Sequence, residues 1–121
     1  MKAIKITTDN KITEINVEEP PHRSLGVEVG GFIEIVRPRR LKSPYVMIVD
    51  EEGLLKECHE NLVGSVLYGA SEHGYPIFGD IVIMREDFGP EGPDLFGLDT
   101  LDTLYISDLA EKILWGDFDE S

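Results

Sequence analysis

The residues of this chain that could carry nucleophilic or metal chemistry are its single cysteine, its three histidines and its many carboxylates. Cys58 and His59 are adjacent, and His73 follows fourteen residues later. A thiolate beside an imidazole can act as a nucleophile with its base, and both side chains bind zinc. However, adjacent side chains diverge, and zinc sites supply three or four ligands at characteristic spacings. We therefore expect no catalytic residue, no metal ligand and no cofactor.

A small metal- or thiol-dependent hydrolase is kept as an alternative. It requires at least three of Cys58, His59, His73 and nearby acids to converge in one concave pocket. The acidic turn Asp50-Glu51-Glu52-Gly53 does not extend this chemistry, because it lacks the alternating oxygen ligands of a calcium loop. The glycines do not follow phosphate-loop spacing either. We expect the turn to be a solvated hairpin tip whose glycine matters more than its charges.

Two segments hold chemistry that folding alone does not require. His73-Gly74-Tyr75-Pro76 joins a flexible glycine and a fixed proline to side chains that stack or form hydrogen bonds, although its turn chemistry favours a tight turn that leads into the strand at Ile81. The stretch after Met84 is rich in acids, glycine and proline, which indicates a long surface loop. The residues that we expect to contact a partner are His73, Tyr75, Asp87, Glu91 and Asp94.

The charge of the chain is unevenly distributed. Its net charge is -13, and the last 37 residues carry 11 acids against 2 bases. Nucleic-acid binding draws on Lys and Arg that displace counterions, and only Arg37, Arg39, Arg40 and Lys42 form a basic cluster. Direct nucleic-acid binding is therefore disfavoured, and the expected partner is another protein, for which a basic surface is compatible with this charge.

Cysteine content and hydropathy bound the compartment. One cysteine allows no intramolecular disulfide, which is typical of reducing compartments. The first ten residues alternate between apolar and polar types instead of forming a signal peptide, and no window approaches a transmembrane span. The sequence predicts a cytoplasmic protein that has no contact with membranes.

The first half of the chain reads mainly as strands. Segments 2–7 and 11–17 alternate and flank the turn formers Thr8, Asp9 and Asn10, which predicts a hairpin. Pro20 and Pro21 end the pairing, and 22–30 then has room for a short helix with Ser24 near its start or for an ordered loop. Strands are expected at 32–36 and 45–49, with 54–57 as a short returning strand.

The second half supplies two clear helices. Asn61 is a good N-cap for a helix whose apolar residues recur at helical spacing from Leu62 to Ala70. A buried strand follows at 81–84, an irregular loop at 87–102, and a final helix capped by Ser107 and closed by Trp115. The prediction is one α+β domain over 1–115, with a mostly antiparallel sheet of about five strands and two helices packed on it. Residues 116–121 are expected to form an acidic C-terminal tail.

The combination of these segments resembles the family catalogued as domain of unknown function 3846, which occurs in bacteria, their phages and mobile elements. The resemblance runs from the first strand to about Asp99. It implies a small intracellular protein encoded on a mobile element, and it supplies no catalytic residues. The segments that carry it are 30–36 (GGFIEIV), 49–55 (VDEEGLL), 61–69 (NLVGSVLYG) and 73–83 (HGYPIFGDIVI).

Three functions are consistent with these features. We expect a non-enzymatic accessory protein that binds another protein through its acidic or loop-presented surface. The first alternative is a DNA mimic, whose ordered carboxylates would occupy the nucleic-acid site of a host protein. It requires the acids to lie along one elongated face at phosphate-like spacing. The second alternative is the hydrolase described above.

Overall fold

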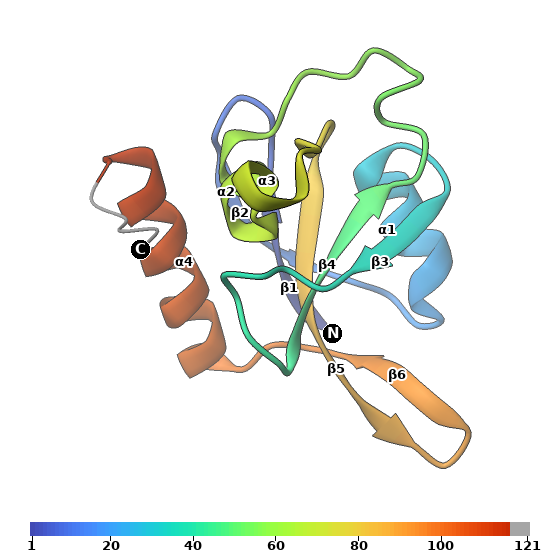
Figure 1. The fold of residues 1–121 in the computed structure, drawn as a ribbon. Coiled ribbons are helices and arrows are strands. Elements are labelled where there is room, and N and C mark those ends of the chain that lie inside the picture. Colours follow the sequence, from blue (N-terminus) through green and yellow to red (C-terminus); the bar gives the residue numbers. More distant parts are fainter. Residues whose placement is uncertain (117–121) are drawn as a thin grey trace.

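The computed structural model describes residues 1–116, apart from the side chain of His73. One sheet contains all six strands, and every pairing in it is antiparallel. The strand order is β2-β1-β5-β4-β3, and β6 pairs with the far half of β5 (Figure 1). The elements are β1 (Lys2–Ile6), β2 (Ile12–Asn16), α1 (Pro21–Val29), β3 (Ile33–Val36), β4 (Tyr45–Asp50), α2 (Leu62–Tyr68), α3 (Ala70–His73), β5 (Ile81–Gly89), β6 (Gly92–Phe96) and α4 (Thr100–Leu114).

Both faces of the sheet are covered, because successive side chains of each strand point to opposite faces. On one face, Val82 and Met84 of β5 pack with Leu25 and Val29 of α1. On the other face, strand residues such as Ile83 pack against α2 and α4. The α+β prediction is therefore confirmed, with helices on both sides of the sheet.

The prediction of a returning strand at 54–57 is wrong. After Gly53 the chain turns on itself, with backbone bonds from Lys56 N to Glu52 O and from Cys58 N to Gly53 O. Glu57 has a φ of 58°, which is left-handed backbone that a strand does not contain. Apolar Leu54 and Leu55 indicated a strand, but both side chains are exposed in this turn.

The prediction of an irregular loop at 87–102 is also wrong, because most of this segment forms a hairpin. Strand β5 continues to Gly89, and β6 returns along it from Gly92. Gly92 has a φ of 114°, which only glycine adopts readily, and it ends a two-residue loop made by Pro90 and Glu91. Glycine and proline are typical of irregular loops, whereas here they build a tight turn.

The last helix begins before the predicted cap at Ser107. Asp99 is the N-cap of α4, and its side chain accepts a hydrogen bond from Asp102 N while the Asp102 side chain accepts one from Asp99 N. This reciprocal pair is a capping box formed by two aspartates. Ser107 lies inside the helix. Of the predicted tail at 116–121, all but Gly116 lies outside the described residues.

Asp102 also joins the start of α4 to the sheet. Its Oδ1 accepts a hydrogen bond of 2.6 Å from Tyr45 Oη, and its Oδ2 lies 3.7 Å from Arg85 Nε. The ring of Tyr45 stacks on Tyr105 of α4, with 5.8 Å between the ring centroids. Burial and the hydrogen bond to Asp102 raise the pKa of Tyr45 to about 12. Burial alone would raise the pKa of Asp102, but its hydrogen bonds with Tyr45 and Asp99 and the charge of Arg85 lower it below 3.8.

The contacts of Asp102 with Tyr45 and Arg85 predict that the fold loses stability in acid. A carboxyl group whose folded pKa lies below its unfolded value stabilises the fold above the unfolded value, and this contribution is lost as the pH falls through the folded pKa. Asp102→Asn should therefore lower the free energy of unfolding by about 1 kcal/mol at neutral pH. The difference from the unsubstituted chain should shrink as the pH falls below 4, measured by urea unfolding at each pH. A difference that does not change with pH would contradict the role given to the charge of Asp102.

Candidate functional site

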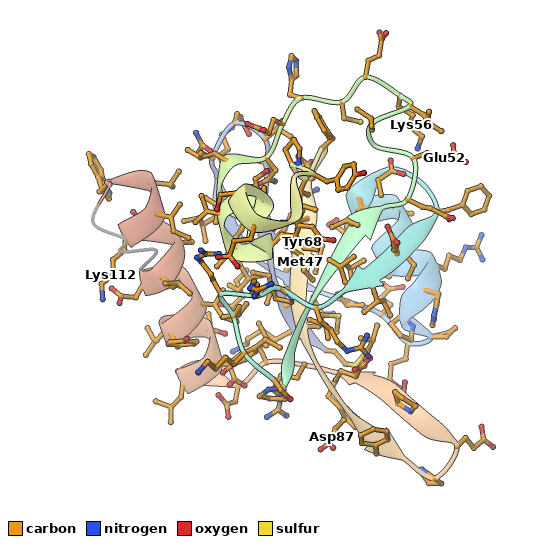
Figure 2. All side chains as sticks on the ribbon, in the orientation of Figure 1. Met47, Glu52, Lys56, Tyr68, Asp87 and Lys112 are labelled. Atoms are coloured by element: carbon orange, nitrogen blue, oxygen red, sulfur yellow. The ribbon has the colours of Figure 1, made fainter. Side chains whose placement is uncertain are left out.

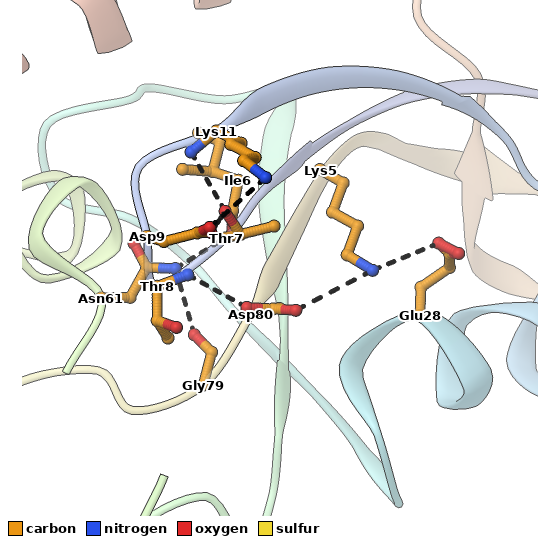
Figure 3. A network of polar contacts seen from close by, with 10 residues as sticks. All are labelled: Lys5, Ile6, Thr7, Thr8, Asp9, Lys11, Glu28, Asn61, Gly79 and Asp80. Carbon is orange, nitrogen blue, oxygen red and sulfur yellow. Dashed lines mark hydrogen bonds and ion pairs between the residues drawn. The ribbon is translucent and has the colours of Figure 1, made fainter. Parts of the chain in front are cut away.

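A buried asparagine holds together the segments around the predicted contact residues. Asn61 is completely buried, and its Nδ2 donates to Ile6 O and Gly79 O, both at 3.0 Å. Its Oδ1 accepts from Gly64 N at 2.8 Å, which confirms the predicted N-cap of α2. Figure 3 shows this side chain between the end of β1 and the turn before β5. One residue therefore fixes three separate parts of the chain.

The cysteine and its neighbouring histidine lie beside a shallow hollow of about 240 Å³, which Asp80 also lines. Asp80 is engaged in structural contacts, because its Oδ1 accepts from Thr8 N at 3.0 Å and its Oδ2 lies 3.9 Å from Lys5 Nζ (Figure 3). Lys5 also lies 3.7 Å from Glu28 of α1. Among the described side chains, which do not include that of His73, no three His, Cys, Asp or Glu residues gather so that they could hold a metal ion. The hydrolase stays an alternative prediction.

The acidic turn after β4 matches the predicted solvated tip at Glu51 and Glu52, which are exposed, and differs from it at Asp50. The Asp50 side chain is 1% exposed, and its Oδ2 accepts a 2.8 Å hydrogen bond from Lys56 Nζ. The same ammonium group donates to Gly30 O, and the bond to Asp50 raises the pKa of Lys56. The glycine does matter as expected, because a Cβ on Gly53 would lie 2.5 Å from the carbonyl oxygen of Phe78. The turn is thus held against both α1 and the segment before β5.

A shallow groove of about 190 Å³ opens beside this turn. Tyr75 forms part of its wall and is 72% exposed, while Tyr68 at the end of α2 lies deeper. Figure 2 places Tyr68 near Met47 at the centre of the molecule, with Glu52 and Lys56 further out. Three carboxylates line the groove, of which Asp50 is paired with Lys56 while Glu34 and Glu51 form no ion pair with described residues. The remaining lining residues are Val36, Val49, Gly53, Leu54, Pro76, Ile77 and Phe78.

The β5–β6 hairpin carries the three predicted acidic contacts. Asp87 and Asp94 are opposite each other in the strand register, and Glu91 lies in the turn. All three are exposed, and no ion pair between described residues neutralises them. Phe88, which the sequence reading did not single out, is 81% exposed beside them. Figure 1 shows the hairpin extending away from the body of the molecule.

The five predicted contact residues therefore belong to two surfaces. Tyr75 borders the groove, and His73 ends α3 close to it in the chain. The three acids lie on the hairpin, at the opposite end of the molecule from α3 (Figure 1), and Asp87 marks that end in Figure 2. The residues predicted from the sequence lie on both surfaces, but Glu34 and Phe88, which line or accompany them, were not among these residues.

The comparisons with known proteins add one finding. The family model described as Domain of unknown function (DUF3846) matches residues 1–94, which end within β6 and leave α4 outside the match. No curated protein and no solved structure matches the chain. None of the helices in residues 1–116 is long and apolar enough to cross a membrane. Because the match covers more than half of the length of this chain, the chain belongs to the DUF3846 family.

Proposed function

We propose that this chain is a small acidic accessory protein, encoded by a phage or another mobile element, that binds a basic partner protein without catalysis. Its main contact surface is the β5–β6 hairpin. The observation that carries the proposal is the exposed Phe88 beside Asp87, Glu91 and Asp94, whose charges are not neutralised by described residues. An exposed aromatic residue surrounded by polar groups is the usual composition of a binding hot spot.

The hairpin extends from the body of the molecule and is anchored at its base (Figure 1). The base of the hairpin is fixed, because Glu86 Oε1 lies 2.5 Å from Arg37 Nη2. Leu95 is also buried, on the face of the sheet that α1 covers. The oxygens of Asp87 and Asp94 accept hydrogen bonds from the next backbone N–H, which orients both carboxylates. A preorganised surface loses little conformational entropy on binding. We place the protein in the cytoplasm as part of the proposal, which fits its single cysteine.

The distribution of ion pairs supports protein binding over DNA mimicry. Glu14 on β2 pairs with Lys2, Asp108 on α4 pairs with Lys112, and Glu72 on α3 pairs with arginine. These neutralised carboxylates lie on separate elements, whereas mimicry requires a continuous row of free charges. Mimicry stays an alternative prediction, which a partner that releases nucleic acid on binding would support.

The test of the proposal is affinity capture from a bacterial lysate with matched variants. The hairpin variant is Asp87→Asn, Glu91→Gln and Asp94→Asn, and the control variant removes the same charge elsewhere through Glu18→Gln, Glu19→Gln and Glu111→Gln. A basic partner should bind the unsubstituted chain at low salt and dissociate at high salt. The hairpin variant should bind this partner at least about tenfold more weakly, because facing charge pairs are lost. The control variant should bind within about twofold of the unsubstituted chain, since distant exposed charges are screened.

Equal weakening by both variants would mean that net charge alone attracts the partner, and it would contradict the proposed surface. A second variant, Phe88→Ser, separates the contribution of apolar contact to binding from the contribution of charge. It should weaken binding by about tenfold without changing the salt dependence, as expected for the loss of an apolar anchor. Unchanged binding of both the charge variant and Phe88→Ser would remove the hairpin from the proposal.

A further inference from the structure

The edge strand β3 has backbone groups that face outward without partners. β3 ends the sheet and pairs with β4 alone. Glu51 N donates to Phe32 O at 2.9 Å, so these two residues form a hydrogen-bonded pair. In an antiparallel pair, bonded and non-bonded residues alternate, so Glu34 bonds to β4 while the backbone groups of Ile33 and Ile35 point away from it. No hydrogen bond between described residues uses these outward groups.

The groove lies along the same strand. Glu34 and Val36 face the side of the sheet that α2 covers, and both line the groove with Tyr68 and Tyr75. Ile33 and Ile35 face the opposite side and pack against the α1 core. A strand added to β3 would therefore place alternate side chains over the groove, and the others beside Ile33 and Ile35.

The charge of the groove determines which side chains fit. Glu34 and Glu51 form no ion pair with described residues, whereas Asp50 is already paired with Lys56. The exposed ring of Tyr75 offers a face on which a cation can stack. Arginine or lysine is thus favoured on the groove side of an added strand. Apolar residues are favoured on the other side, opposite Ile33 and Ile35.

The β2 edge of the sheet does not offer the same features. α4 contacts β2, and Glu14 of β2 is paired with Lys2 at 3.1 Å. Pairing of β3 with a second copy of the chain would bring two Glu34 carboxylates and two net charges of -13 together. Charge complementarity therefore selects a basic occupant rather than another copy.

We propose that β3 binds an extended basic segment of the partner as an additional strand, with its cationic side chains over the groove. This inference rests on the proposed function, because it gives the same basic partner a second contact, remote from the hairpin. Strand addition of this kind takes its affinity from backbone hydrogen bonds and its specificity from alternate side chains.

The test uses a labelled hexapeptide of alternating valine and arginine and fluorescence anisotropy on the intact chain. Two matched peptides carry N-methyl groups on the valine amides or on the arginine amides, which removes donors without changing charge. One set of amides faces β3, so one methylated peptide should lose at least about tenfold in affinity, as expected from several lost backbone bonds. The other should bind within about twofold of the parent peptide, because its methyl groups face away from β3. If the valine-methylated peptide loses affinity, the peptide adds antiparallel to β3. If the arginine-methylated peptide loses affinity, it adds parallel to β3.

Variants of the chain test the groove side chains. Glu34→Gln and Tyr75→Ala should each weaken binding of the parent peptide by about three- to fivefold, the range expected for an exposed charge pair or cation–π contact. Glu14→Gln, which removes a carboxylate from the opposite edge strand, should leave the affinity unchanged. In the complex, hydrogen exchange at the Ile33 and Ile35 amides should slow.

Equal binding of both methylated peptides, or equal weakening by Glu34→Gln and Glu14→Gln, would overturn the proposal by reducing the binding to charge attraction. Self-association of the chain that Glu34→Gln strengthens would also overturn it, since a second copy would then occupy β3. These outcomes leave the hairpin test intact, because the peptide does not report on Asp87, Glu91 or Asp94. Conversely, failure of the hairpin variants to weaken partner binding would leave the peptide result standing.

Discussion

Replacement of Asn61 by alanine is expected to lower the free energy of unfolding by about 3 kcal/mol, combining a lost N-cap with two buried carbonyls left without their donor. The side chain is completely buried, and its hydrogen bonds reach Ile6, Gly64 and Gly79. Water cannot replace these bonds without entering the core. Urea unfolding followed by circular dichroism measures the change.

The control is Asn16→Ala at the end of β2, where the exposed side chain accepts one hydrogen bond from the N-terminal amine. This change should cost no more than about 0.5 kcal/mol, as is usual for exposed positions. A similar cost for both substitutions would show that Asn61 does not connect α2, β1 and the turn before β5.

Gly53→Ala is expected to destabilise the chain by about 2 kcal/mol, because overpacking against backbone forces a main-chain shift. The added Cβ would lie 2.5 Å from Phe78 O and 3.2 Å from its carbonyl carbon. Neither atom can rotate away as a side chain would. Since both Gly53 and Phe78 line the groove, the same change should also alter the groove.

Gly89→Ala provides the matched control, because its Cβ would meet its nearest neighbours at 3.6 Å and 3.9 Å, which is ordinary contact. Its cost should stay within about 0.5 kcal/mol. Thermal unfolding of the two variants in parallel makes the comparison. Equal midpoint temperatures of unfolding for Gly53→Ala and Gly89→Ala would refute the close approach of the turn after β4 to the segment before β5.

Local signals explain which elements the sequence predicted. Asn61 and the apolar stripe after it lie within one short segment, so both the cap and α2 could be identified there. The start of α4 was missed because its capping box uses aspartate at both positions, whereas the usual pattern begins with Ser or Thr and ends with Glu or Gln. The β5–β6 hairpin was missed because Gly92 and its neighbouring prolines resemble a loop unless the returning strand is recognised.

The candidate site was predictable only where exposure follows from local chemistry. Acids next to glycine and proline indicate solvent, and the described Asp87, Glu91 and Asp94 are exposed. The role of Glu34 was not predictable, because it depends on β3 being an edge strand, and strand order is set by contacts far apart in the sequence. The burial of Asp50 depends similarly on Lys56 and Gly30, which reach it from other segments.

Hydrogen–deuterium exchange tests whether the hairpin is the main surface for a basic partner. The chain is measured alone and in complex with the partner that affinity capture isolates. In the complex we expect slower exchange across residues 86–95, with little change in β2 and α4. Protection confined to other elements, with unchanged exchange in residues 86–95, would contradict this role of the hairpin.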